Sequence, residues 1–562
     1  MLWQIKNHRV EIFNSSSGKY EDFCEEIRID SIFTDLLTGR KNYEIFLFDD
    51  LSGGITFTVP ASKINRNIVP ALAEYGFTQL DNESVNNRVQ QILLESKYSA
   101  THNYTHNKLG FHKVAGKLAF LAHTPIRVND SQKSTSEYIY PYKTKPHGAL
   151  DDWKKVVLNE VIGRPNMELA LALSAVPPLA FLLRKSKVLS LIPMIALIGA
   201  SSTGKSISLK LIASVYGSPE ESKGLVSDMN ATENALMAQL ANNAGIPAIF
   251  DETSAYDGNL SKFLYHLPKG REKQRCQAAG ELRDPLYFSG AMFFSGEKSV
   301  LAQQTNGNEG LFGRLLEITL PWTDDEHHAQ RLESGCRQYN GTAVYPLIEW
   351  ILENQENLSD LFWDEYKFLK NRLPDSKGIE DRLVKTYALI ALSACVVGLA
   401  WNLPIDINQI RETLLSLHDT NRRRLNSPEK VFEKIKSLIL ENFACFPTET
   451  FVGSARTIWG EYGRYKHIAG FWIMSDKFHE FLAKSHGDEI PNIEKIFFEK
   501  GWLARTSDRH YKIPHSLGGV GVKCYFLYLS DKIAVKEPKT TSSHKSNRQI
   551  KKYDETEEEN RP

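Results

Sequence analysis

Eight residues near the middle of the chain, GASSTGKS at positions 199–206, have the types and spacing of a phosphate-binding loop. Gly199 and Gly204 permit backbone angles that aim successive N–H groups at phosphate oxygens. Lys205 would neutralise the β- and γ-phosphates, and the Ser206 hydroxyl would ligate Mg²⁺. The other loop residues expected to contact the nucleotide are Ser201, Ser202 and Thr203. The sequence therefore predicts a binding site for ATP with Mg²⁺.

A second group of chemically capable residues follows the apolar run 246–250, where Asp251 and Glu252 stand next to each other. Asp251 would hold the Mg²⁺ shell through a water molecule, and Glu252 would orient and activate the attacking water. The alternative is that both carboxylates only end a strand at the surface. Because the two motifs follow each other in order, each after an apolar strand, we expect hydrolysis of ATP and not binding alone.

The elements that must position these residues alternate strand and helix. An apolar run at 191–198 precedes the loop, and a helix at 207–216 follows it. Residues 224–226 fit a short strand, and a capping-box pattern starts a second helix at 230–242. In this chain order, only the segment 224–226 falls between the strand of the loop and the Asp-Glu strand.

Residues 262–283 carry a run of basic side chains. Four of them would pair with phosphates and bind nucleic acid without reading its sequence. They are Lys269, Arg271, Lys273 and Arg275. The alternative is a solvated surface, which is the usual role of a charge run.

Five short strings give the chain a resemblance to a known family: GASSTGKS at 199, IFDE at 249, YHLPKGREKQR at 265, FFSGE at 293 and GLFGR at 310. On these strings the chain resembles a bacterial P-loop family common on mobile elements. That family includes the cassette-chromosome helicases, which are similar to MCM-type AAA+ replicative helicases. The resemblance implies an ATP-dependent DNA helicase or translocase that works as a ring, with a hexamer as the expected form. Single-stranded or forked DNA is the implied partner.

The resemblance also implies roles for three polar residues. Ser295, at the end of an apolar strand, takes the place of the sensor-1 residue that contacts the γ-phosphate and the attacking water, although Asn or Thr is usual there. Arg314, ahead of another strand, is the candidate arginine finger for a neighbouring subunit's ATP; an ordinary surface arginine is the alternative. Arg382 is a candidate sensor-2 residue or a helix-surface ion-pair partner. The basic run would project into the channel of the ring.

The expected fold class is α/β, with an AAA+-type P-loop NTPase core at residues 150–325. An N-terminal α+β accessory domain, a helical region and a C-terminal winged-helix-like domain surround this core. Their expected boundaries are 1–128 for the N-terminal domain, 129–149 for a polar linker, 326–427 for the helical lid region, 428–532 for the winged-helix-like domain and 533–562 for a disordered charged tail.

Within the N-terminal domain, residues 43–48 and 55–59 fit paired strands, and residues 84–96 fit a helix. Another strand pair is expected at 110–112 and 118–121. Four histidines also fall in this domain: His102, His106, His112 and His123. We expect them on exposed loops and not at a metal, because no Cys or carboxylate completes a ligand set.

Composition is that of an ordinary globular protein. Lys and Arg together number 68, as do Asp and Glu, which excludes a globally basic nucleic-acid binder but not a basic patch. The 6 Cys form no Cys-x-x-Cys pair, so we expect reduced thiols in a cytoplasmic protein. The apolar stretch 169–183 is short for a membrane span and contains Pro177, so we expect a buried helix and no membrane contact.

Two other functions fit parts of the sequence. In a regulatory or defence ATPase, ATP binding would switch assembly with a protein partner, and a winged-helix domain does not discriminate this from a DNA motor. A nucleotide kinase would also carry the loop, but the lid motif of such kinases is missing. The basic run, the helical region and the C-terminal domain also argue against a kinase.

Overall fold

The computed structural model describes residues 2–528 with short gaps. The positions left out within that span are 66, 128–130, 140–141, 222–223, 242, 257, 259, 273–274, 277–281, 284–285, 302–308, 426–427, 449–456, 486–491 and 509. The chain divides into two compact units, residues 1–422 and 423–562, and each is described by itself. This division falls close to the boundary expected at 428.

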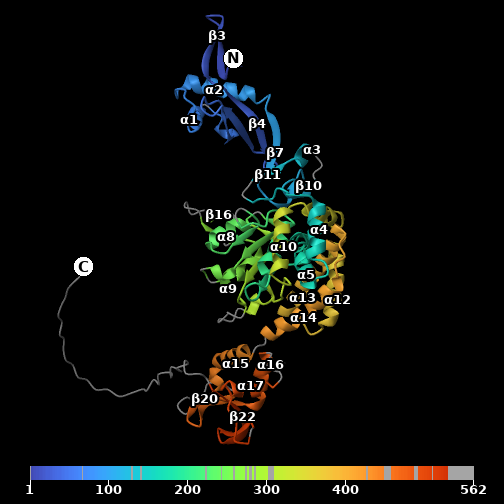
Figure 1. The fold of residues 1–562 in the computed structure, drawn as a ribbon. Coiled ribbons are helices and arrows are strands. Elements are labelled where there is room, and N and C mark those ends of the chain that lie inside the picture. Colours follow the sequence, from blue (N-terminus) through green and yellow to red (C-terminus); the bar gives the residue numbers. More distant parts are fainter. Residues whose placement is uncertain are drawn as a thin grey trace, which may run out of the picture. The chain divides into compact units, whose positions relative to one another are not determined.

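The first unit contains a parallel sheet that carries the phosphate-binding loop (Figure 1). Its core strands, in sheet order, are β13 (Val226–Asp228), β14 (Ala244–Asp251), β17 (Ser289–Gly296), β12 (Met194–Ile198) and β18 (Leu315–Ile318). The strand β17 therefore lies between β12 and β14, although it follows both in the sequence. The chain order gave no sign of this insertion. All residues of β17 after Ser289 are buried, as expected for a central strand of a parallel sheet.

A hairpin and a short strand extend this sheet beyond β14. They are β8 (Gly110–Val114), β9 (Lys117–Leu121) and β10 (Pro125–Ile126). The contact is made where Gly110 pairs with Ala244. Gly110 has a φ of +86°, and a Cβ there would lie 2.0 Å from the Ala244 carbonyl oxygen, so only glycine fits. The domain boundary expected at 128 is therefore wrong for residues 110–126, which share the sheet of the core.

The preceding residues form two further sheets. One is a three-stranded meander of β1 (Trp3–Lys6), β2 (Arg9–Asn14) and β3 (Lys19–Glu25). The other has the order β11-β7-β4-β5-β6 and comprises β4 (Ile27–Asp35), β5 (Lys41–Leu47), β6 (Ile55–Pro60), β7 (Thr101–His106) and β11 (Glu137–Tyr138). Helices α1 (Ile68–Ala73) and α2 (Glu83–Ser96) contribute apolar side chains to the core of this sheet. The strands β5 and β6 and the helix α2 match the expected elements, whereas β11 lies in the stretch expected to be a linker.

His106 departs from the expectation of an exposed loop histidine. It lies in β7 and is fully buried, with its ring nitrogens bonded to the Ser136 hydroxyl and the Ala122 carbonyl oxygen. Burial lowers the pKa of His106 to about 4, so the ring stays neutral and links β7 to the end of β9. Within the described ranges, no three His, Cys, Asp or Glu side chains form a group that could hold a metal ion.

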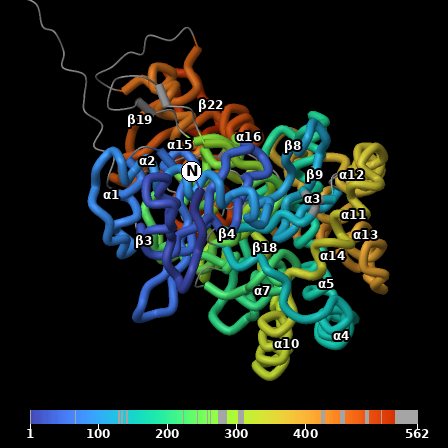
Figure 2. The backbone as a smooth tube through the Cα atoms, turned by 90° about the horizontal axis from the view of Figure 1, so that it is seen from above, coloured from blue at the N-terminus to red at the C-terminus, as the bar shows by residue number. Residues whose placement is uncertain are grey.

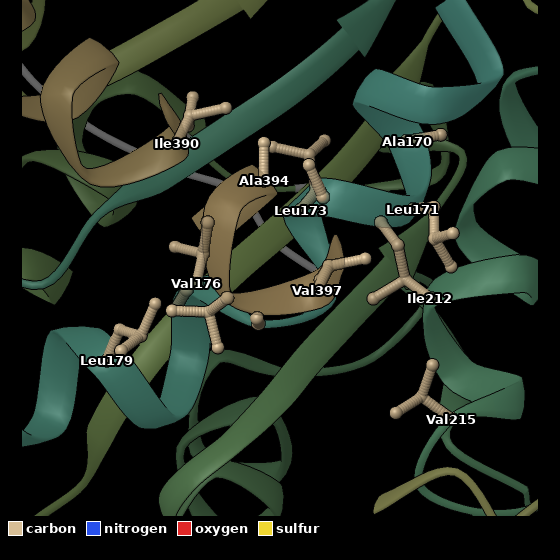
Figure 3. Packing of buried hydrophobic residues seen from close by; sticks show 14 of the residues in the cluster. Ala170, Leu171, Leu173, Val176, Leu179, Ile212, Val215, Ile390, Ala394 and Val397 are labelled. Atoms are coloured by element: carbon tan, nitrogen blue, oxygen red, sulfur yellow. The ribbon is translucent and has the colours of Figure 1, made fainter. Parts of the chain in front are cut away.

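The helices around the loop pack through one continuous apolar cluster (Figure 3). They are α5 (Pro165–Leu173), α6 (Val176–Lys185), α7 (Lys205–Ser214) and α13 (Ile379–Trp401). The stretch 169–183 was expected as one buried helix. It is divided between α5 and α6, because Pro177 and Pro178 are tolerated in a first helical turn but not in the interior of a helix. The helix α13 and the bent pair α5–α6 are long and apolar enough to cross a membrane, but 67% of the α13 window is buried inside the protein.

The remaining helices of the first unit lie around this core. They are α3 (Ser131–Ser134), α4 (Leu150–Glu160), α8 (Glu233–Leu240), α9 (Leu260–His266), α10 (Glu326–Gln338), α11 (Val344–Glu353), α12 (Leu358–Arg372) and α14 (Ile407–Leu425). Figure 2 shows α10 beside α4 and α7, both of which it contacts. The helices α10 to α14 lie within 326–427, the stretch that was expected to be a helical region.

The second unit has its own core, in which helices pack on a four-stranded sheet. In chain order its elements are α15 (Pro428–Glu441), β19 (Gly460–Tyr465), β20 (Ile468–Met474), α16 (Ser475–Lys484), α17 (Ile493–Glu499), β21 (Ile513–Leu517) and β22 (Val520–Tyr528). The sheet order is β19-β20-β22-β21. The three helices are present as expected. The β19–β20 hairpin was not predicted, because Lys466 and His467 take the positive φ angles of its turn without a glycine. The tail expected from 533 lies outside the described residues.

Candidate nucleotide site

The phosphate-binding loop joins the buried strand β12 to α7. Gly199 donates a backbone hydrogen bond to the Gly296 carbonyl at the end of β17, over 3.2 Å. Gly204 precedes α7 with a φ of +85°, and a Cβ there would lie 2.7 Å from Thr323. Glycine is therefore required at 204 by both the backbone and the space. The free N–H groups of the first turn of α7 are suited to bind phosphate.

Lys205 is 7% exposed and folds back over the loop. Its Nζ donates to the carbonyl oxygens of Gly199, at 2.9 Å, and Ala200, at 2.7 Å. These carbonyls hold the ammonium group at the place where the loop would receive phosphate. A triphosphate offers charged acceptors, which form stronger hydrogen bonds than neutral carbonyls do.

The structure brings Ser206, Asp251 and Ser295 together at the carboxyl ends of β14 and β17. The Ser206 hydroxyl donates to Asp251 Oδ1 at 3.1 Å, and the Ser295 hydroxyl donates to the same oxygen. Ser295 Oγ also accepts from the Glu252 backbone N–H at 2.9 Å. The hydroxyl of Ser206 and the carboxylate of Asp251 are hard oxygen donors on one edge of the sheet, so they fit Mg²⁺. The sequence had placed all four residues near the nucleotide, but their contact depends on β17 lying beside β14.

Glu252 has a left-handed backbone with a φ of +58°, and its carboxylate caps the short 3-10 turn η2 (Thr253–Ala255). Oε1 of Glu252 accepts from the Ser254 backbone N–H at 3.3 Å and from the Ser254 hydroxyl. Ser254 therefore occupies Oε1 of the carboxylate that was expected to orient and activate the attacking water. The sequence gave no indication of this contact.

Glu297 is a second carboxylate at the loop, and sequence reasoning assigned it no role. It follows β17 and accepts a hydrogen bond from the Ser201 hydroxyl. The signal was present in the string FFSGE, in which Glu297 follows Ser295 by two residues. A carboxylate at this position would be repelled by a bound triphosphate.

Arg314 lies at the opposite edge of the sheet from the loop. It immediately precedes β18, whose first residue, Leu315, pairs in parallel with Met194 at the start of β12. The loop follows the other end of β12, so about 13 Å of strand separates the two edges. The Arg314 guanidinium lies 4.0 Å from the centroid of the Tyr265 ring. Its Nη1 is buried without a hydrogen-bond partner. Arg314 therefore faces away from the loop of its own chain.

Other predicted cations share this amino-terminal edge. Arg382, in α13, lies beside Gly313. A Cβ built onto Gly313 would lie 3.2 Å from Arg382 Cδ. Lys269 and Arg271 are exposed, on either side of Gly270. In the part of the chain that the structure describes, none of these cations or Arg314 forms an ion pair. Lys273 lies outside the described residues, and only the backbone of Arg275 is described, in β15 (Arg275–Cys276), which pairs with β16 (Leu282–Arg283).

Comparison with known proteins agrees with the family indicated by the motifs. Residues 7–286 match the domain of unknown function DUF927. The chain also resembles a solved structure described as SCCmec type IV Cch, active helicase, with a TM-score of 0.65 and 20% sequence identity. The match covers 94% of this chain and 97% of that one. The predicted resemblance to the cassette-chromosome helicases is thereby confirmed as a likeness of fold.

Two further comparisons add no argument. The apo structure of the C-terminal region of NrS-1 matches 88% of this chain and 96% of its own, but with 9% identity and a TM-score of 0.25. No curated protein matches the chain. The likeness of fold to a known protein therefore depends on the SCCmec type IV Cch structure. The chemistry of the site is inferred from the residues of this chain.

Proposed function

We propose that this protein is an AAA+-type, ATP-hydrolysing motor that works as a DNA helicase or translocase of a mobile element or phage-related replication system. One observation carries the proposal. Ser206, Asp251, Glu252 and Ser295 meet at one edge of the sheet, and Arg314 lies at the other. The first group supports hydrolysis within a chain. Because Arg314 points away from its own loop, we propose that it completes the site of a neighbouring subunit in a ring, with a hexamer as the expected size.

The residues divide the work of hydrolysis as follows. The loop N–H groups and Lys205 bind and neutralise phosphate, and Ser206 and Asp251 hold Mg²⁺, which screens the charge of the phosphates. Ser295 fixes the orientation of the Asp251 carboxylate and of the Glu252 backbone. Glu252, released from Ser254, orients the attacking water and accepts its proton. Arg314 of a neighbour stabilises the charge that develops in the transition state.

The second unit supports a DNA partner. Its order of helix, two strands, two helices and two strands, with β20 and β21 on either side of β22, supports a winged helix. In the first unit, the exposed Lys269 and Arg271 supply phosphate contacts that do not depend on sequence. We propose that single-stranded or forked DNA contacts these two cations and also contacts the second unit.

The alternative function is a regulatory or defence ATPase, in which ATP binding switches assembly with a protein partner. The hydrogen bonds of Ser254 to Glu252 favour it, because they keep the water-activating carboxylate occupied until something displaces it. The two functions differ in what stimulates hydrolysis.

ATP hydrolysis by the full chain, measured with no DNA, with single-stranded DNA and with duplex DNA, tests the proposal. We expect stimulation by single-stranded DNA, loss of hydrolysis in Lys205→Ala, and a mass in the presence of a non-hydrolysable ATP analogue that corresponds to a ring. Nucleotide-dependent assembly without any effect of DNA would favour the alternative.

Variants of the basic residues test the DNA contact separately. Lys269→Ala and Arg271→Ala should reduce stimulation by DNA and its salt dependence while hydrolysis without DNA persists. Lys155→Ala is a control that removes an exposed cation from α4, a helix outside this segment that packs against α10. Unchanged stimulation in both variants would remove the channel role of this segment.

A further inference from the structure

One aromatic side chain, Tyr265, lies between the proposed DNA contact and Arg314. It is the penultimate residue of α9, which runs directly into the 3-10 turn η3 (Leu267–Lys269). Its ring lies 4.0 Å from the Arg314 guanidinium. Lys269 therefore follows Tyr265 by one helical turn. If DNA moved Lys269 or Arg271, the short segment 265–271 would carry that movement to the aromatic side chain of Tyr265.

The backbone around Gly270 is held tightly, so this segment cannot yield independently. Gly270 accepts from the Phe288 N–H at 3.0 Å, Glu272 donates to Leu286 at 2.8 Å, and Pro268 accepts from the Ile192 N–H at 3.0 Å. A Cβ on Gly270 would lie 2.7 Å from the Phe288 carbonyl oxygen. The segment with Lys269 and Arg271 is thus anchored to the chain that leads into β17 and β12.

Gly310 lies against both side chains of the Tyr265–Arg314 contact. A Cβ on Gly310 would lie 3.1 Å from the Tyr265 ring and 3.2 Å from Arg314 Nη1, so glycine at 310 leaves room for both side chains. The adjacent Arg314 guanidinium lowers the pKa of the Tyr265 phenol, with smaller contributions from Lys269 and Arg382. In the described part of the chain no carboxylate pairs with Arg314, so the ring is what fixes the direction of this guanidinium.

We propose that Tyr265 is the positioning residue for Arg314, and that DNA bound at Lys269 and Arg271 stimulates hydrolysis by setting this aromatic contact. This inference rests on the proposed function, because it presupposes a DNA-stimulated ATPase with Arg314 as its finger. The cation–π interaction orients the guanidinium without neutralising it, which leaves its charge for a phosphate of the neighbouring subunit.

The test is a double-mutant cycle on full-length protein, with kcat and KM for ATP measured with and without single-stranded DNA. We expect Tyr265→Ala to lower the DNA-stimulated kcat about tenfold, with KM unchanged, and to bring the stimulation ratio close to one. Tyr265→Phe keeps the ring and should retain stimulation within about twofold. The double variant Tyr265→Ala with Arg314→Ala should be no slower than Arg314→Ala alone, because both changes remove the same interaction.

The control is Tyr98→Ala, which removes an 84% exposed tyrosine beside Lys97 far along the chain from this segment. Thermal unfolding of each variant excludes loss of the fold. Stimulation that survives Tyr265→Ala, a higher rate without DNA in that variant, or a further loss in the double variant would overturn the role of Tyr265 alone. A wild-type rate that DNA does not change would instead contradict the proposed function, and the link through Tyr265 with it.

Discussion

The two edges of the central sheet differ in how their polar groups are satisfied. At the carboxyl edge, Lys205 bonds to loop carbonyls, Ser206 and Ser295 bond to Asp251, and Glu252 bonds to Ser254. At the amino edge, the cations Lys269, Arg271, Arg314 and Arg382 have no partner within ion-pair distance among the carboxylates that the structure describes. The polar groups of the first edge are thus paired with one another. The cations of the second edge are not paired within the described residues, which fits the proposed binding of phosphates from other molecules.

A partly buried charge without a counter-charge is costly, so an anion that reaches it gains much of the electrostatic energy that the free chain lacks. Arg314 illustrates this, because its Nη1 is buried and makes no hydrogen bond. In the proposed ring, the nucleotide site of one subunit and the cations of the next subunit together form one active site. Each half can be altered without touching the other.

Arg314→Ala should have the largest effect on the comparison. We expect kcat for ATP to fall about 1000-fold with ATP binding retained, because the guanidinium acts only on the transition state. Mixing this variant with Lys205→Ala should restore hydrolysis, since a mixed ring joins an intact loop to an intact Arg314. The measurement is steady-state hydrolysis against mixing ratio, with the exposed Arg337→Ala as control. Mixtures no faster than the separate variants would show that the two edges do not meet between subunits.

Glu252→Gln should have the next largest effect, confined to the carboxyl edge. Hydrolysis should fall about 100-fold, since the amide cannot accept a proton from water. Affinity for ATP should be unchanged, because the loop and Lys205 are intact. Single-turnover hydrolysis and equilibrium binding of a fluorescent ATP analogue measure the two quantities. A large loss of affinity would place Glu252 in binding and not in the chemical step.

Ser295→Ala should lower hydrolysis about tenfold, because it removes hydrogen bonds to both Asp251 and the Glu252 backbone. Ser295→Thr keeps the hydroxyl and is the matched control. We expect a stronger dependence on Mg²⁺ concentration in the alanine variant, since Asp251 loses its fixed orientation. Equal rates in the two variants would mean that the hydroxyl plays no part.

Ser254→Ala should have the smallest effect and the opposite sign. Without the hydroxyl that binds the Glu252 carboxylate, the rate without DNA should rise about threefold, which is the size expected from losing one capping hydrogen bond. The DNA-stimulated rate should stay the same if DNA already releases Glu252. A fall in both rates would show that Ser254 supports the active orientation instead.

The sequence by itself predicted the chemistry of the carboxyl edge. The phosphate-binding loop and the Asp-Glu pair could be predicted because each is a short motif of adjacent residues. The chemistry of such a motif depends mainly on its own residues and on the strand that precedes it. The apolar runs also predicted the strands β12, β14 and β17 and the helix α7 near their observed bounds. These are local properties of 5 to 10 residues.

Only the tertiary structure decided which residues meet. The insertion of β17 between β12 and β14 brings Ser295 to Asp251, and no property of residues 289–296 alone specifies their neighbours in the sheet. Local sequence also does not specify the pairing of Gly110 with Ala244, which makes residues 110–126 part of the core sheet. Nor does it specify the contact of Tyr265 with Arg314. Long-range pairing depends on the total burial of many side chains, whereas a motif depends on a few adjacent residues.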